Sequence, residues 1–219
     1  MAGPFDYQGR GPLKPKFQVF SASGTFTPSA GLLAAGGNIT VKLWGAGGGG
    51  GGGYQYYSHG FGGNAGNCII KPLNISAAQT VTIGTGGTGG TGGGSGTNGT
   101  SGGNSTFGSL LTAEGGGGGK FPNNLYGQAL TKATPNGTSI YAIYYGSMGY
   151  WYTGAGGSAK DIGIGGIYLG NSGGAPTNGG IASGGGGGAS DGTNTAFSTG
   201  ANYSGAAGGD GYCIVEWWE

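Results

Sequence analysis

The fold follows from residues 39–53, which read ITVKLWGAGGGGGGG. In the first half, Ile39, Val41 and Leu43 alternate with residues of an opposite face, the period-two pattern of a strand that buries one side. The second half ends in seven consecutive glycines. A strand that runs directly into glycine predicts a β-structured core that is extended by bare backbone.

Glycine makes up 63 of the 219 residues and forms runs at Gly47 to Gly53, Gly115 to Gly119 and Gly184 to Gly188. Because glycine loses more backbone entropy on folding than any other residue, a glycine-rich fold must gain something that side chains would forbid. We expect that gain to be close approach of backbones. A disordered linker is the alternative for such a composition. The chain is 11% aromatic and only 7% charged, with a net charge of +1, so folding is favoured.

Three further segments between the glycine tracts are typical of strands, at residues 67–75, 80–83 and 212–218. The last is expected to complete a sheet at the end of the chain. Residues 1–16 contain prolines and basic residues but no apolar run, so we interpret them as an extended attachment arm and not as a secretory signal or a membrane span. Residues 17–219 are predicted to form one glycine-rich domain.

Residues 84–93 read GTGGTGGTGG and place threonine at every third position. Three residues per turn is the period of the extended left-handed polyproline II helix. Such a helix would carry threonine on one edge and bare backbone on the other two, so that neighbouring helices could hydrogen-bond to it as in polyglycine II. A collagen helix is disfavoured, because the register lapses after Gly92 and prolines are few. Since each glycine inside an α-helix costs about 1 kcal/mol relative to alanine, almost no α-helix is expected.

The chain resembles the glycine-rich domain found at the ends of bacteriophage tail fibres and in related phage structural proteins. The motifs that carry this resemblance, in chain order, are FSASGTFTPSAG, NITVKLWGAGGGGGGG, QTVTIGTGGTGG, STFGSLLTAEGGGGG and GGDGYCIVEWWE. The order of strand and glycine run is also similar to the glycine-rich domain of the anaplastic lymphoma kinase receptor. These resemblances imply an all-β fold, a jelly-roll-like β-sandwich whose connections are packed polyglycine II helices. The first also implies a virion protein.

Catalytic and metal-binding chemistry finds little support, and we expect neither enzyme activity nor a cofactor. His59 is the single histidine, which leaves one candidate base for a triad and no multi-histidine metal site. The acidic residues form no pair with a suggestive spacing, no P-loop motif follows a glycine run, and the dispersed basic residues form no stripe for nucleic acid. Cys68 and Cys213 lie in predicted strands and are interpreted as buried free thiols.

Two aromatic clusters form the predicted recognition site. They mix tyrosine and tryptophan with serine and glycine, as recognition loops combine rigid anchors with adaptable polar neighbours. The first cluster comprises Tyr54, Tyr56, Tyr57, His59 and Phe61. The second comprises Tyr141, Tyr144, Tyr145, Tyr150, Trp151 and Tyr152. These aromatics could equally cap the glycine bundle or fill a subunit interface.

Two functions remain open at this point. The first is a tail-fibre tip adhesin that binds a bacterial surface glycan or an outer-membrane protein through the aromatic loops. The alternative is a purely structural virion component, such as a capsid decoration or a fibre-attachment protein. In both, the arm at residues 1–16 is expected to bind other virion proteins, with no nucleic acid partner and no membrane insertion. Both place the mature protein in the virion, assembled in the host cytoplasm.

Overall fold

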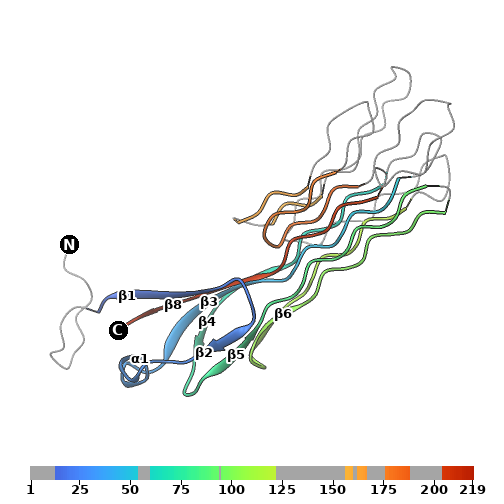
Figure 1. Ribbon diagram of the computed structural model, residues 1–219. Coiled ribbons are helices and arrows are strands. Elements are labelled where there is room, and N and C mark those ends of the chain that lie inside the picture. Colours follow the sequence, from blue (N-terminus) through green and yellow to red (C-terminus); the bar gives the residue numbers. More distant parts are fainter. Residues whose placement is uncertain are drawn as a thin grey trace.

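The protein has two parts, a β-sandwich and a bundle of extended segments that projects from it (Figure 1). The structure is a computed structural model. It describes residues 13–53, 60–93, 95–121, 156–159, 162–166, 176–187 and 204–219. Residues 1–12 of the predicted arm lie outside this part of the chain.

The sandwich consists of two antiparallel sheets, as the sequence predicts. The first sheet has the order β1 (Pro15–Phe20), β8 (Tyr212–Trp218), β3 (Asn38–Trp44) and β4 (Cys68–Asn74). The second has the order β2 (Gly24–Phe26), β5 (Gln79–Thr82), β6 (Ser105–Phe107) and β7 (Leu111–Ala113). The C-terminal strand β8 therefore lies inside its sheet, between β1 and β3, and the strand that begins at Pro15 takes the last two residues of the predicted arm into the domain.

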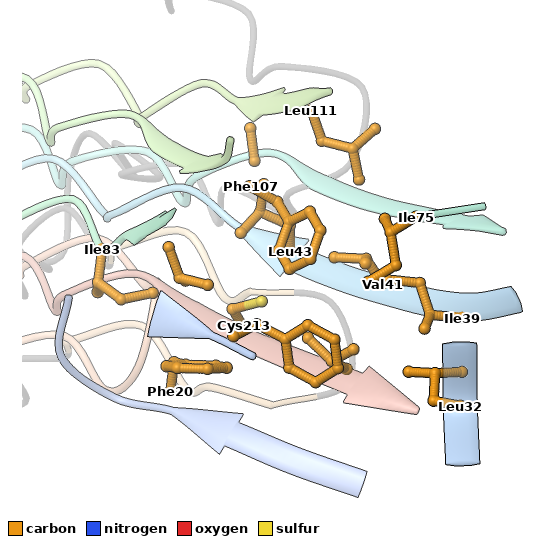
Figure 2. Close-up of a cluster of buried hydrophobic side chains, with 14 residues drawn as sticks. Phe20, Leu32, Ile39, Val41, Leu43, Ile75, Ile83, Phe107, Leu111 and Cys213 are labelled. Atoms are coloured by element: carbon orange, nitrogen blue, oxygen red, sulfur yellow. The ribbon is translucent and has the colours of Figure 1, made fainter. Parts of the chain in front are cut away.

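The core lies between the two sheets and confirms the predicted alternation. Ile39, Val41 and Leu43 of β3 are all buried there, at 3% exposure or less. Figure 2 shows them facing Phe107 and Leu111 from the second sheet. Because side chains of a strand alternate between its two faces, the intervening residues of β3 point out of the sandwich.

Trp44 departs from the expected pattern. It belongs to the outward face of β3 but is 2% exposed, in a second buried cluster with Ala65, Cys68, Ala159 and Ala182. These residues come from the first sheet and from the start of the bundle, so Trp44 packs where the two parts of the molecule join. Its ring lies 6.1 Å from that of Tyr212 on the neighbouring strand.

Both cysteines are buried and neither forms a disulfide, as predicted. They flank β3 on opposite sides, but Cys213 pairs with Leu43 and Cys68 with Trp44, so the two side chains belong to opposite faces of the sheet. Burial raises the pKa of Cys213 to about 12. Its thiol therefore stays protonated at neutral pH and serves as a core side chain.

The helical content of the described residues is one short element, α1 (Ala30–Ala34). Ser29 caps its N-terminus by accepting a hydrogen bond from the N–H of Leu32 at 3.0 Å. The Ser29 hydroxyl also donates to the Glu219 carboxylate, and this contact lowers the pKa of Glu219 below its ordinary value. The last residue of the chain is thereby attached to the sandwich.

Candidate recognition end of the glycine bundle

Residues 45–53 form a central segment of the bundle. The backbone N–H groups of residues 45–52 donate in rotation, with a period of three residues, to three neighbouring segments at distances of 2.8 to 3.1 Å. The acceptor segments are 60–67, 96–104 and 204–211. Their carbonyl oxygens accept from a further three, at 84–93, 114–121 and 183–187. Six neighbours and a three-residue period are the packing of polyglycine II, so this prediction is confirmed for the described segments.

The absence of side chains in the central segment is a steric requirement. A Cβ added at any position from Gly47 to Gly52 would lie less than 3.0 Å from a backbone carbonyl oxygen of a neighbouring segment. The obstructing segment also rotates with a period of three: Gly49 and Gly52, for example, both face 84–93. Real Cβ atoms essentially never approach so closely, so any larger residue must push the segments apart.

A second segment, 183–187, is also interior. It is hydrogen-bonded to 45–53, 60–67 and 204–211. On the side away from the central segment it is hydrogen-bonded to three more segments. Those three are 156–157, 162–166 and 176–180. The two interior segments are those that contain the glycine runs from Gly47 and from Gly184. In segment 183–187, a Cβ added at Gly184, Gly185 or Gly187 would lie less than 3.0 Å from a backbone carbonyl oxygen of a neighbouring segment.

The outer segment 84–93 carries a side chain at every third residue. Thr85, Thr88 and Thr91 of segment 84–93 are exposed, whereas Gly87 and Gly90 of the same segment are buried. The predicted edge of threonine is therefore confirmed.

These threonines also complete the backbone bonding. The N–H of Thr88 donates to the Thr100 hydroxyl at 2.8 Å, and the N–H of Thr91 donates to the Thr97 hydroxyl at 2.9 Å. Asn98 acts in the same way at another edge, accepting from the N–H of Phe121 at 2.7 Å. Polar side chains thus satisfy N–H groups that have no backbone acceptor on the outside of the bundle.

The segments alternate in direction. The order of the hydrogen bonds along each segment shows its direction. The segments that run away from the sandwich are 45–53, 84–93, 114–121, 162–166 and 183–187. Those that run back towards it are 60–67, 96–104, 156–159, 176–180 and 204–211. The chain consequently leaves the described bundle at the end of an outgoing segment and re-enters it at the start of a returning one. This holds at Gly53 and Gly60, and again at Phe121 and Gly156.

Phe61 is the one predicted site residue within the described part of the chain. It is half-buried, its N–H donates to the Lys120 carbonyl at 3.0 Å, and its own carbonyl accepts from Gly51 at 2.8 Å. Phe61 therefore lies near the end of the bundle farthest from the sandwich. The other predicted site residues lie outside the described residues: Tyr54, Tyr56, Tyr57, His59, Tyr141, Tyr144, Tyr145, Tyr150, Trp151 and Tyr152.

The structure adds Phe121 to this end of the molecule. Its ring lies over Gly96, where a Cβ would collide with it. Phe61 and Phe121 belong to adjacent segments. The exposed Lys120, next to Phe121 in the sequence, connects them by accepting from the N–H of Phe61. The sequence analysis did not select Phe121. Its position was nevertheless a signal, because it follows the glycine run of residues 115–119 and Lys120 and so marks the end of an outgoing segment.

The described residues contain no group of three or more histidine, cysteine or acidic side chains that could hold a metal ion. No helix among them is both long enough and apolar enough to cross a bilayer.

The model of a glycine-rich domain family matches residues 21–218. The chain belongs to this glycine-rich domain family. The match covers every described segment of the bundle and the sandwich apart from β1 and Glu219. A search of curated proteins finds no significant match.

Proposed function

We propose that this glycine-rich protein is a phage virion component, a tail-fibre tip adhesin that binds a bacterial surface receptor. The receptor is a glycan or an outer-membrane protein. The observation that carries the proposal is the direction of the chain: both aromatic clusters, at residues 54–61 and 141–152, follow outgoing segments of the bundle. The sandwich, which carries the two ends of the described chain, lies at the end of the bundle where the outgoing segments begin (Figure 1).

The bundle gives such loops a rigid base. Gly53 and Gly60, which bound the first cluster, belong to segments that are hydrogen-bonded to each other along their length. Phe121 and Gly156, which bound the segment containing the second cluster, are likewise held in the lattice, through Asn98 and Gly166. Anchoring both ends of a loop lowers the ordering entropy that binding would otherwise cost. Buried aromatic anchors can then contribute about 2 kcal/mol or more each.

The predicted N-terminal arm, together with the sandwich that it precedes in the sequence, is proposed to attach the protein to other virion proteins. A purely structural role, as a capsid decoration or a fibre-attachment protein, is the second candidate. It is favoured by exposed apolar side chains on the sandwich, notably Phe17 at 72% and Trp218 at 52% exposure. Such side chains commonly mark a contact surface.

Binding to bacteria tests the proposal. Fluorescently labelled protein is applied to a panel of bacterial strains, and bound protein is measured by flow cytometry after periodate or protease treatment of the cells. We expect Tyr57→Ala, Tyr145→Ala and Trp151→Ala each to weaken binding by about tenfold or more. Leu110→Ala, in the turn between β6 and β7, is the matched control and should bind normally. If the three aromatic variants lower the melting temperature strongly and leave binding intact, the aromatics belong to the scaffold.

A further inference from the structure

The two edges of the first sheet differ in which backbone groups they leave open. Lys14 and Glu219 exchange both backbone hydrogen bonds, at 2.8 and 3.1 Å, so this pair is a hydrogen-bonded pair of the antiparallel ladder. Because such pairs alternate along a ladder, the even-numbered residues of β1 bond to β8. The N–H and C=O groups of Phe17 and Val19 therefore point away from the sheet.

The opposite edge is protected. Gly45 donates to Asn67, and Ile75 donates to Gly37, so the odd-numbered residues of β4 bond to β3. The even-numbered residues point outward, and among them Pro72 has no N–H to offer. A proline at this position blocks a further strand from pairing along the middle of β4.

β1 has no comparable protection at its centre. Pro15 stands at its first position, but Phe17 and Val19 follow with open backbone groups that no described residue pairs. Their side chains are 72% and 41% exposed. Figure 1 shows β1 along the border of its sheet, with β8 on its inner side. An open strand edge with apolar side chains is a template for pairing with another strand.

We propose that a second copy of this chain occupies the edge, with the two β1 strands antiparallel about a twofold axis at Gln18. In this register Phe17 of each copy exchanges both backbone hydrogen bonds with Val19 of the other. The two four-stranded sheets become one continuous sheet.

The side chains of β1 suit this register. Phe17 lies opposite Val19, an aromatic and β-branched pair of the kind that stabilises antiparallel strands. Gln18 lies opposite Gln18, and Lys16 opposite Phe20, so no like charges face each other. Because β1 ends at Phe20, the residue opposite Pro15 lies beyond the partner strand, and the missing N–H of Pro15 costs no hydrogen bond of the ladder. The edge is therefore complementary to itself, as a twofold interface requires.

Sedimentation velocity of the purified full-length protein tests the proposal, with circular dichroism of every variant to verify folding. We expect a dimer whose fraction rises with concentration between about 1 and 100 μM, the range of moderate affinity. Val19→Pro removes an outward N–H without touching the bonds to β8, and should raise the dissociation constant at least about tenfold. Ile70→Pro removes an outward N–H from the β4 edge, and should leave the dimer unchanged. Phe17→Lys, which keeps the backbone donor, provides a second disrupting variant if Val19→Pro does not fold.

The outcomes decide the matter in both directions. A dimer that is lost in Val19→Pro or Phe17→Lys and retained in Ile70→Pro establishes the pairing. A wild-type protein that stays monomeric throughout the range overturns it, and would assign the edge to a strand of a different protein or to residues 1–12. A dimer that survives both β1 variants also overturns it.

Discussion

The sandwich and the bundle solve the same packing problem in opposite ways. In the sandwich, side chains such as Phe26 and Phe107 fill the space between two sheets, and both are 1% exposed or less. In the bundle, the space between neighbouring segments is filled by backbone, and Gly47 to Gly53 are buried without any side chain. The sandwich therefore depends on the volume of its side chains, whereas the bundle depends on their absence.

The comparison shows how a chain with so much glycine can fold. Ordering glycine costs more conformational entropy than ordering any other residue. In return, segments without Cβ atoms approach closely enough for each of residues 45–52 to donate its N–H to a neighbouring segment. Buried backbone that is fully hydrogen-bonded avoids the desolvation cost of unpaired polar groups, and the close contacts add dispersion.

The largest expected effect comes from deleting volume in the sandwich. Phe107 is 0% exposed and packs on Phe26 with ring centroids 6.1 Å apart. Phe107→Ala should lower the free energy of unfolding by about 3 to 5 kcal/mol, because it leaves a cavity between the sheets. Equilibrium urea denaturation measures this loss. Leu110→Ala, at an exposed position in the turn between β6 and β7, is the control and should change the free energy by no more than about 0.5 kcal/mol.

The reverse change should damage the bundle. Gly49→Ala adds a single methyl group, which would overlap the carbonyl oxygen of Thr88. Because the obstruction is backbone in a bonded lattice, we expect a loss of about 2 to 3 kcal/mol in the same denaturation experiment.

Gly117→Ala is the matched control for that substitution. It lies in an outer glycine run, and the nearest atom to an added Cβ is Asn64 Nδ2, at 3.4 Å. This substitution should be neutral or stabilise the protein by about 0.5 kcal/mol, since alanine restricts the unfolded chain. Equal losses for Gly49→Ala and Gly117→Ala would show that the interior and outer positions do not differ.

The smallest effect should come from the threonine edge. Thr100→Val removes the hydroxyl that accepts from the N–H of Thr88, at a site that is exposed to water. We expect a loss of about 1 kcal/mol or less in thermal unfolding. Thr85→Val is the control, because the Thr85 hydroxyl bonds to no described residue. An equally large loss for Thr85→Val would mean that threonine stabilises these segments through its backbone conformational preference and not through this hydrogen bond.

Much of the fold could be predicted from local patterns. Alternation in residues 39–43 identified the buried face of β3, and the spacing of Thr85, Thr88 and Thr91 identified both the three-residue period and the outer edge. Lateral placement could not be predicted, because neighbours in the lattice are distant in sequence. Nothing local shows that the run from Gly47 is interior while the run from Gly115 is outer, or that Trp44 is covered by Ala159 and Ala182.

The candidate recognition site was harder to predict from the sequence. Composition drew attention to the aromatic clusters, and the structure places Phe61 at the end of the bundle away from the sandwich. Phe121 escaped notice because it is a single aromatic residue, and its position depends on the length of the outgoing segment. The role of the clusters in binding stays a prediction.

Amide hydrogen exchange, followed by NMR, tests the central claim most directly. If residues 45–53 are the interior of a hydrogen-bonded lattice, the amides of Gly47 to Gly52 should exchange as slowly as those of Val41 and Leu43 in β3, through opening of the whole domain. Protection should be continuous along the run, because every one of these N–H groups is bonded to a neighbouring segment. Exchange of these amides at the rate of an unstructured glycine chain, while β3 stays protected, would contradict the account.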